Sequence, residues 1–327
     1  METPFSDAWW KPKNTGKNKS MKIFLTGASG YLGSLLAERF AELPEVEGIT
    51  GIGLSLPSRP VPAKMKFTQM DMRSPEMPKL MAGHDVVVHT AAIVLWPKKM
   101  PAQERDDINL NGVRHVAQAA RANNVRRFVH TSSMAAYDPI LARGKSDVTE
   151  DFPLGGNSPY YYWNGKATQE KVLTEILGPT STVLTFLRPI YIIGPRNQAV
   201  VKSYRENAVN FMGYNPRRQF IHEEDVAAAF LLALKKDLPG AYNVAPDDFI
   251  RLSDVWRIVG KKFVPTVPLP LAKMITAFKW HFAGSPVHPC WIEDMLVDFT
   301  GNNKKLKAAG WTPKYASEPA LKSAILD

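Results

Sequence analysis

A tyrosine and a lysine four residues apart, Tyr162 and Lys166, are the pair in this sequence best suited to move protons. On a helix, residues at this spacing lie on one face, so both side chains can enter one cleft. A phenol with a pKa of about 10 is a poor acid or base at neutral pH, and a neighbouring ammonium stabilises the phenolate. The pair is therefore suited to exchange a proton with a hydroxyl or carbonyl group, although a surface helix could show the same spacing.

A run of glycines near the N-terminus has the spacing of a phosphate-binding loop. The residues from Thr26 to Gly33 are Thr-Gly-Ala-Ser-Gly-Tyr-Leu-Gly. Gly27 allows a tight turn, Gly30 lets the backbone approach a pyrophosphate, and Gly33 lets the following helix pack closely. The N-terminus of that helix offers free N–H groups to an anion. We expect a dinucleotide here, although a purely structural turn could use the same glycines.

The segments that would position these residues alternate between strands and helices. Short apolar runs predict strands, and the valines of Asp85–His89 are typical of a buried parallel strand. The expected strands are Lys22–Leu25, Ile49–Leu54, one that leads to Asp71, Asp85–His89, Arg127–Thr131 and Thr182–Leu187, and the expected helices are Tyr31–Leu43, Gln103–Asn123 and Tyr160–Leu177. This alternation predicts an α/β fold with a doubly wound parallel sheet.

The rest of the chain is less regular. A strand near Gln219–His222, a helix over Glu224–Lys235 and a strand near Ala241–Val244 are expected to rejoin the main sheet. Residues 1–20 are polar and without periodicity, which predicts a flexible tail. The expected division is a cofactor-binding domain of residues 21–188 and about 216–245, with a smaller C-terminal substrate-capping lobe of about 189–215 and 246–327.

Composition and charge limit the classes to which the protein can belong. The 327 residues are 45% apolar and 22% charged, as in a globular protein, and the single cysteine, Cys290, excludes an intramolecular disulfide framework. The apolar runs fall short of the ~20 residues that cross a bilayer, and no signal peptide is visible. We therefore expect a cytoplasmic protein. The net charge of +10 favours anions, but no nucleic-acid-binding motif accompanies it, so no nucleic acid is expected as a partner.

Together the motifs resemble those of the extended short-chain dehydrogenase/reductase superfamily, in its NAD-dependent epimerase/dehydratase and 3β-hydroxysteroid dehydrogenase-like branch. The glycine loop is similar to the cofactor fingerprint of that superfamily, and Tyr162 and Lys166 to its catalytic pair. Further similar segments are Asp71-Met72, His89–Ala92, Asn109–Val113, Thr131–Tyr137, Leu187–Pro195 and Arg218–Asp225. The resemblance covers about residues 21–245 and implies a Rossmann sheet, a nicotinamide dinucleotide and hydride transfer.

The resemblance also implies roles for individual residues. Ser133 falls where a hydroxyl orients the substrate oxygen, Tyr162 is the general acid/base, and Lys166 tunes it and holds the nicotinamide ribose. Ser132 is expected to be structural, and Asn109 to support a helix or a proton relay. The residues implied in cofactor binding are Gly27, Ser29, Gly30, Tyr31, Leu32, Gly33, Ser55, Arg59, Asp71, Met72, Thr90, Ala91, Ala92, Asn109, Tyr162, Lys166, Pro189 and Ile190.

The end of the second expected strand departs from the pattern of NAD-preferring relatives, which have an acidic residue there to bind the ribose 2′-hydroxyl. Gly53 stands at that position in this sequence, and Ser55, Ser58 and Arg59 follow. A carboxylate would repel a 2′-phosphate, whereas a nearby arginine can bind one. We therefore expect NADP(H) to be favoured over NAD(H).

Four features bear on the substrate. Tyr191 stands where relatives that act on nucleotide-sugars usually have asparagine, and the segment from Pro195 to Arg218 is short for a nucleotide-binding lobe. Arg218 itself occupies the place of an arginine that can meet a diphosphate, or it could form a structural ion pair. The lobe offers apolar and aromatic residues, namely Phe263–Pro270, Met274, Phe278, Trp280, Phe282, Trp291 and Met295.

These features favour an oxidoreductase that transfers hydride between the nicotinamide and a hydrophobic secondary alcohol or ketone, such as a sterol-, terpenoid- or aromatic-like compound. One alternative is a nucleotide-sugar epimerase or dehydratase that retains its cofactor. A second alternative is a non-catalytic dinucleotide-binding redox sensor, although such a sensor has no need of the acid/base pair.

The remaining expectations concern metals and partners. His281, His288 and Cys290 lack the spacing of a metal site, so no metal is expected. The basic, amphipathic stretch Lys262–Phe282 could touch a membrane surface. By resemblance, we expect a homodimer formed through the helices around Gln103–Asn123 and Tyr162–Leu177.

Overall fold

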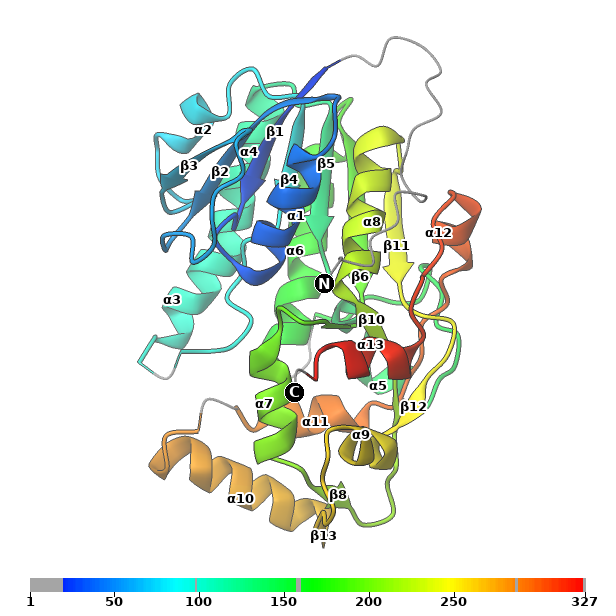
Figure 1. Cartoon of the computed structure of the whole chain (residues 1–327). Coiled ribbons are helices and arrows are strands. Elements are labelled where there is room, and N and C mark those ends of the chain that lie inside the picture. The colour runs from blue at the N-terminus through cyan, green and yellow to red at the C-terminus, as the bar shows by residue number, and fades with distance from the viewer. Residues whose placement is uncertain (1–19, 98, 157–159, 286–287, 326–327) are drawn as a thin grey trace.

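A seven-stranded parallel sheet forms the centre of the structure, a computed structural model that describes residues 20–97, 99–156, 160–285 and 288–325 (Figure 1). The strand order is β11–β6–β5–β4–β1–β2–β3, and every neighbouring pair is parallel. The strands are β1 (Met21–Thr26), β2 (Val46–Gly53), β3 (Met65–Gln69), β4 (Val86–His89), β5 (Arg127–Thr131), β6 (Val183–Pro189) and β11 (Gly240–Val244). The predicted doubly wound parallel sheet is confirmed.

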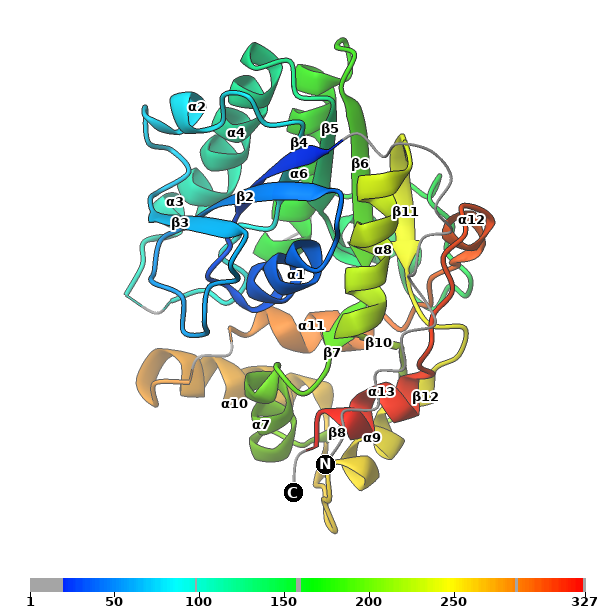
Figure 2. The same ribbon diagram turned by 45° about the horizontal axis from the view of Figure 1, so that its top comes forward.

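Helices cover both faces of this sheet, and each face has its own apolar core (Figure 2). Alternate side chains of a strand point to opposite faces. In β4, Val86 and Val88 therefore enter one core and Val87 the other. The first core is closed by α1 (Tyr31–Ala41) and α8 (Glu223–Lys235), and the second by α2 (Met77–Leu80), α4 (Gly112–Ala122) and α6 (Tyr161–Leu177).

A π-helical turn interrupts the long helix that the sequence predicts over Gln103–Asn123. The chain forms α3 (Ala102–Asp106), the π turn at Asp107–Asn111 and then α4. Such turns add a residue to the helical ladder and are frequent at functional sites. The turn places Asn109 against the loop after β4, where its Oδ1 accepts from the Ile93 N–H (2.8 Å) and its Nδ2 donates to the Ile93 carbonyl (3.0 Å).

A C-terminal lobe lies beyond the carboxyl ends of the central strands (Figure 1). Its longest helices are α7 (Gln198–Glu206) and α10 (Leu269–Phe282). The other elements outside the main sheet and its helices are α5 (Pro139–Ala142), β7 (Tyr191–Ile193), β8 (Asn210–Phe211), β9 (Arg217–Arg218), β10 (Phe220–His222), β12 (Ile250–Arg251), α9 (Leu252–Ile258), β13 (Thr266–Val267), α11 (Cys290–Leu296), α12 (Lys304–Ala308) and α13 (Ser317–Ser323). Of the helices in the part of the chain that the structure describes, none has the length and apolar character to cross a membrane.

The expected strand near Gln219–His222 forms as β10 but does not join the main sheet. It pairs in parallel with β7, in a separate two-stranded sheet. The free edge of β6 is already occupied by β11, so β10 pairs instead with the segment that continues from β6 toward the lobe. The expectation that this strand returns to the main sheet is therefore wrong, whereas the one for Ala241–Val244 is confirmed by β11.

Polar contacts join α1 to the segments that lead into the lobe. The residues on α1 are those of its first turn and its outer face, and their partners come from the loop after β7 and the start of α8. The contacts are Arg39–Glu224 (2.6 Å), Arg196–Glu38 (2.5 Å) and a hydrogen bond from the Tyr31 phenol to Glu223 (2.5 Å). The helix that begins at the glycine loop is thereby fixed to the entry of the lobe.

Candidate active site

The strand order reverses between β1 and β4, and at such a point doubly wound sheets bind ligands in the crevice outside the carboxyl ends of the strands. The glycine loop follows β1. Gly27 has φ +72°, and a Cβ added there would lie 2.8 Å from the amide nitrogen of Ala91. A Cβ at Gly33 would overlap the carbonyl of Gly27. Only glycine fits at these two positions, so the loop backbone lies directly against the segment after β4.

The start of α1 supplies N–H donors to this crevice. Gly30 is the N-cap residue and no side chain caps the helix, so the first N–H groups have no intrahelical acceptor. Such a glycine-lined turn at an uncapped helix N-terminus fits the pyrophosphate of a dinucleotide. Three predicted cofactor residues turn their side chains elsewhere: Leu32 and Met72 are buried in the two cores, and the Tyr31 phenol binds Glu223. At these positions only the backbone is left for a cofactor.

Asp71, which the sequence predicts to contact the adenine, already has a partner. Its carboxylate pairs with Arg73 (2.5 Å), and Arg73 also binds Asp107 (2.5 Å). The hydrogen bond from Arg73 holds the pKa of Asp71 below its usual value, against the effect of burial. Asp71 therefore belongs to an ion-pair network that follows β3.

The end of β2 has no carboxylate. An added Cβ at Gly53 would overlap the hydroxyl of Ser29, and that hydroxyl lies 3.5 Å from the Ser55 Oγ. Arg59 follows in an exposed loop. The margin of the crevice therefore presents hydroxyl groups where an acidic residue would favour a ribose 2′-hydroxyl.

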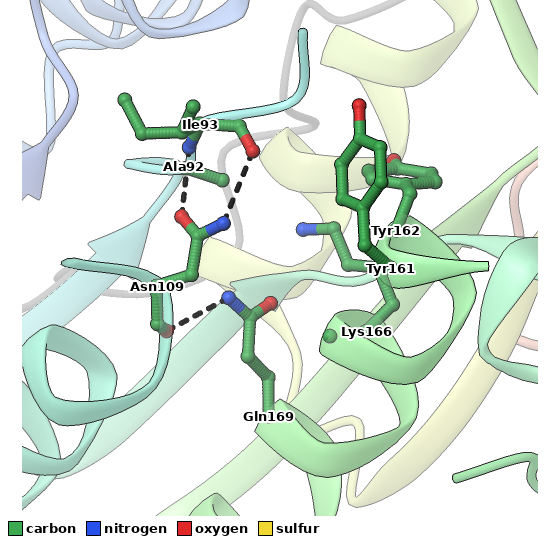
Figure 3. Close-up of a pocket in the computed structure, with 8 residues that line it drawn as sticks. Ala92, Ile93, Asn109, Tyr161, Tyr162, Lys166 and Gln169 are labelled. Carbon is green, nitrogen blue, oxygen red and sulfur yellow. Dashed lines mark hydrogen bonds between the residues drawn. The ribbon is translucent and has the colours of Figure 1, made fainter. Parts of the chain in front are cut away.

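Tyr162 and Lys166 of α6 line a pocket opposite the Asn109 turn (Figure 3). The Lys166 ammonium donates to the carbonyl of Thr131 (2.8 Å) and lies 6.0 Å from the centre of the Tyr162 ring. The pocket is lined by Ala92, Ile93, Asn109, Tyr161, Tyr162, Gly165, Lys166 and Gln169. The structure thus brings the proposed acid/base, its lysine and the segment after β4 into one place.

Burial has a marked effect on Lys166. Desolvation lowers its pKa to about 8, and Glu170 opposes the shift. At neutral pH the side chain is still mostly charged, and it is held in place by the Thr131 carbonyl. A cation fixed in this way is suited to stabilise a neighbouring phenolate.

The two serines after β5 have different surroundings. The Ser133 Oγ accepts from the N–H of Ala135 (3.1 Å) and lies 3.5 Å from the carbonyl of Pro189, at the end of β6. Ser132 is buried and donates to the Glu170 carboxylate, which is the structural kind of contact expected for it. Ser133 is therefore the serine that remains half-buried at the strand end, beside Pro189.

Behind the serines lies a buried ion pair that the sequence did not reveal. Arg188 of β6 binds Glu170 through two hydrogen bonds, Nη2–Oε2 at 2.7 Å and Nε–Oε1 at 2.9 Å. Both side chains are almost completely buried, and Arg188 also donates to the carbonyl of Glu150 (3.0 Å). Because Glu170 lies one helical turn after Lys166, the pair fixes α6 against the sheet below the pocket.

Two buried histidines, His89 and His130, lie near the ends of β4 and β5. His89 begins a segment that resembles a family motif, but the sequence predicted no role for either side chain. The rings of His89 and His130 stack with their centres 5.3 Å apart. Burial, followed by the charge of Lys166, lowers the pKa of His89 to about 3 and that of His130 well below its usual value. Both imidazoles are therefore neutral and add no charge beneath Lys166.

An aromatic cluster connects this pocket to the lobe. The Arg105 guanidinium lies 4.1 Å from the centre of the Trp96 ring and 4.4 Å from that of Tyr161, and Arg105 is only 5% exposed. We define the aromatic cluster as the side chains around Arg105 and Tyr162, namely Trp96, Tyr161, Trp280, His288 and Trp291. Of these, Trp280 and Trp291 are among the aromatic residues that the sequence analysis assigned to the lobe. No motif pointed to Trp96 or Arg105.

Within this cluster, Tyr161 is unsuited to be the acid/base. Its phenol donates to the carbonyl of Val94 (2.9 Å), and burial raises its pKa to about 12. The neighbouring Tyr162 ring instead faces Trp291 of the lobe, with ring centres 5.5 Å apart. This difference supports the choice of Tyr162 between the two.

Several apolar residues expected to line the substrate space face solvent instead. Phe263 is 82% exposed, Met274 63%, Phe278 61% and Phe282 77%. The interpretation that these side chains line a substrate cavity is wrong, because the inward face of α10 is formed by other residues, among them Trp280.

Arg218 is a buried cation in the lobe. It is 4% exposed, its Nη2 donates to the carbonyl of Met295, and its Nη1 lies 3.4 Å from the Tyr191 hydroxyl. Within the residues that the structure describes, no carboxylate forms an ion pair with it, so the structural ion pair considered for it is not present there. Met295 belongs to α11, the helix that also carries Trp291, so a short series of contacts leads from Arg218 to Tyr162.

Replacing Lys166 by methionine is expected to raise the free energy of unfolding of the dinucleotide-free protein at pH 7. The pKa of Lys166 falls from 10.5 to about 8 on folding, so the unfolded chain binds the proton more tightly. A change of one in pKa corresponds to ~1.4 kcal/mol, so the buried charge of Lys166 destabilises the folded wild type by roughly 3 kcal/mol. The variant also loses the hydrogen bond to the Thr131 carbonyl, which lowers its gain in stability by about 1 kcal/mol. Urea unfolding should show a net gain of about 2 kcal/mol.

The pH dependence provides the control. Below pH 8 both states of the wild type hold the proton and the cost is constant, whereas between pH 8 and 10.5 the unfolded state holds more protons and stability rises with pH. The advantage of Lys166→Met should therefore shrink over that range. The exposed Lys79→Met serves as a matched variant with no such trend. A loss of stability in Lys166→Met at every pH would contradict the argument.

Comparison with known proteins gives a consistent picture. Residues 23–245 match the NAD-dependent epimerase/dehydratase family. The chain is 27% identical over 235 residues to UDP-glucose 4-epimerase of Mycolicibacterium smegmatis. The aligned region covers 65% of this chain and 73% of that protein. The chain is 29% identical over 196 residues to 2-alkyl-3-oxoalkanoate reductase of Shewanella oneidensis, covering 56% and 48%. Its fold is similar to that of UDP-glucuronic acid 4-epimerase from Bacillus cereus in complex with NAD, with a TM-score of 0.71, 18% identity and coverage of 93% and 97%.

Proposed function

Because this chain belongs to the NAD-dependent epimerase/dehydratase family, within the extended short-chain dehydrogenase/reductase superfamily, we propose that it is an epimerase or dehydratase that acts on a sugar joined to a diphosphate, as in a nucleotide-sugar, and retains its cofactor. The observation that carries this proposal is Arg218. A buried guanidinium without a carboxylate partner among the described residues, a few contacts from Tyr162, is suited to a diphosphate. Two of the relatives are named as UDP-sugar epimerases, which agrees with this substrate class.

The chemistry proposed for the chain's own residues is a proton transfer coupled to hydride movement. A bound dinucleotide supplies a reversible hydride acceptor. As the carbinol carbon loses its hydride, Tyr162 as phenolate takes the hydroxyl proton at its Oη, and the carbinol becomes a carbonyl. Lys166 stabilises the phenolate, and the Ser133 hydroxyl donates to the substrate oxygen. Return of hydride and proton restores an alcohol and leaves no net change in the cofactor.

A second candidate, the reduction of a hydrophobic ketone or oxidation of the corresponding alcohol, rests on the aromatic cluster. Trp96, Trp280 and Trp291 offer flat apolar surface next to Tyr162. The relative named as 2-alkyl-3-oxoalkanoate reductase agrees with it. It takes second place because Phe263, Phe278 and other apolar side chains of the lobe point away from the pocket. The family match makes the chain an enzyme, so the non-catalytic sensor is no longer a candidate.

Net cofactor turnover separates the two candidates. The protein is incubated with NADP+ or NAD+ and a set of UDP-sugars, and separately with NADPH or NADH and a panel of hydrophobic ketones. Both nicotinamide absorbance and products are followed. The proposal expects an isomerised or dehydrated sugar without net change in absorbance, and a raised KM for that sugar in Arg218→Met. Stoichiometric oxidation of a reduced cofactor by a ketone, with every sugar unchanged, would replace the proposal by the second candidate.

We also propose that NADP(H) binds more tightly than NAD(H), because the margin at Gly53 has no carboxylate and Arg59 is nearby in sequence. Arg59→Ser is expected to weaken NADPH binding about tenfold and leave NADH binding unchanged, since only the 2′-phosphate would meet the guanidinium. Dissociation constants from fluorescence titration measure this. Lys66→Ser, which removes a positive charge from the neighbouring exposed strand position, is the control. A clear preference of the wild type for NADH would refute it.

A further inference from the structure

Helix α10 has two apolar faces, of which only one packs against the protein. Ala272 and Trp280 are its buried residues, and Leu269 and Thr276 lie half-buried on the same side. The opposite side is also apolar, and it is exposed. In Figures 1 and 2, α10 lies at the edge of the lobe, far from the main sheet. Packing of the inward face holds the helix on the lobe, but it does not account for the exposed apolar residues of the outward face.

The outward residues form a continuous stripe. Their positions follow the spacing i, i+3, i+4, i+7 and i+11, which places them on one side of a helix. The residues of this outer stripe are Leu271, Met274, Ile275, Phe278 and Phe282. The Phe278 and Phe282 rings contact each other, with centres 5.2 Å apart, so the stripe is contiguous. A contiguous exposed apolar patch of this kind is typical of an interaction surface.

The charge along the stretch of sequence that carries the outer stripe is of one sign. From Val255 to Ile292 the sequence contains no aspartate or glutamate. The basic residues in this stretch are Arg257, Lys261, Lys262, Lys273 and Lys279. Arg257 pairs with Asp254 (3.4 Å), whereas Lys261, Lys262 and Lys279 are exposed lysines near the outer stripe in the sequence. Exposed Phe263 follows directly after two of them.

The combination of an apolar stripe with basic residues limits what can bind to this surface. A second copy of the chain would bring an identical set of lysines to the contact, and like charges repel. The first twenty residues of the chain are also basic, with four lysines against two acidic residues. An anionic lipid surface offers both of the complementary properties, apolar chains and negative phosphates.

We propose that the outer stripe of α10, together with Lys261, Lys262 and Phe263, binds the surface of a membrane that contains anionic lipids. The helix would lie in the plane of the interface, with Phe278 and Phe282 among the acyl chains and the lysine ammonium groups at the phosphates. Its 14 residues are too few to span a bilayer, so the contact is peripheral.

The inner face of the same helix reaches the candidate active site. Trp280 contacts Trp96 and His288 of the aromatic cluster, with ring centres 6.1 and 5.2 Å apart. One helix therefore has its outer side on the proposed membrane and its inner side on the cluster beside Tyr162. Membrane binding goes beyond the proposed function and does not depend on which substrate the site takes.

Co-sedimentation of the full chain with phosphatidylcholine vesicles, with and without phosphatidylglycerol, tests this inference. We expect binding only to the anionic vesicles, and a decrease as salt is raised. Phe278→Ser/Phe282→Ser should weaken the binding at least about tenfold, because each lost side chain removes apolar area from the interface. Ile140→Ser/Leu141→Ser, which removes equally exposed apolar residues from α5, should leave it unchanged.

Charge reversal tests the electrostatic part. Lys262→Glu/Lys279→Glu should abolish binding, whereas Lys79→Glu/Lys304→Glu, with the same net change on other helices, should retain most of it. The proposal is overturned if the wild type binds neither kind of vesicle, or if the Phe278→Ser/Phe282→Ser variant binds as the wild type does. It is equally overturned if light scattering shows that this variant lowers the oligomeric mass, because the stripe would then be an interface between copies.

Discussion

Tyr162→Phe is expected to lower kcat about a hundred- to ten-thousandfold for the substrate identified by the turnover assay, while the dissociation constant of the dinucleotide changes little. The substitution removes one hydroxyl and keeps the ring that packs on Trp291. General acid/base catalysis by a positioned side chain accounts for rate factors of this size. Steady-state kinetics and cofactor titration on the same preparation measure the two effects separately.

The neighbouring tyrosine provides a matched control. Tyr161→Phe removes the same hydroxyl one residue earlier, where the phenol donates to the Val94 carbonyl. We expect kcat to stay within about threefold of the wild type, because that hydroxyl contacts the Val94 carbonyl and Trp291 and takes no part in the proposed proton transfer. A severe loss in Tyr161→Phe with near-normal turnover in Tyr162→Phe would transfer the acid/base role to Tyr161.

Glu170→Gln is expected to be the most destabilising single substitution near the site. It would leave the Arg188 guanidinium buried without a counter-charge, and it would weaken the contact from Ser132. Removing one partner of a buried pair costs about 3–5 kcal/mol. That is a large part of the 5–15 kcal/mol by which domains are typically stable, so urea unfolding should shift strongly or the variant should be recovered poorly.

Two further variants test whether the loss of stability in Glu170→Gln comes from the buried, unpaired charge of Arg188. Glu206→Gln breaks an exposed pair with Lys202 on α7 and should change stability by less than about 0.5 kcal/mol. Replacing both Glu170 and Arg188 by methionine removes the uncompensated charge and should recover most of the loss. If Glu170→Gln costs less than about 1 kcal/mol, the pair does not hold α6 against the sheet as described.

The central sheet could be predicted from the sequence because its strands are buried on both faces. A strand such as β4, with three valines in succession, has apolar residues that one exposed face would not require. The pairing of β10 could not be predicted in the same way. Its three residues, Phe220–His222, would fit either sheet, and the choice depends on which neighbouring edge is free once β6 and β11 have paired.

The orientation of α10 shows a similar limit. Both of its apolar faces are visible in the sequence, and Phe278 and Trp280 are only two positions apart. Which of them faces inward depends on Trp96 and His288, which come from distant parts of the chain. Helical periodicity identifies a face, but it does not tell whether that face meets the protein or its surroundings.

The candidate site was predicted as far as local motifs allow. Tyr162, Lys166 and Asn109 do line one pocket, as helical spacing and the order of strands imply. Their chemical roles remain predictions. Arg105, held between Trp96 and Tyr161, belongs to no motif, because its position depends on three segments that meet only in the folded chain.

The contacts between α1 and the entry of the lobe limit how parts of this protein can be exchanged with those of a relative. Glu38 lies on the helix of the glycine loop, yet its partner Arg196 lies in the loop after β7, at the entry of the lobe. A chimaera that imports only a foreign lobe would leave Glu38 without the arginine that it pairs with. Substitutions at residues in contact are not additive, so the two parts cannot be exchanged independently. The unit of exchange, in evolution as in engineering, is therefore the lobe together with the outer face of α1.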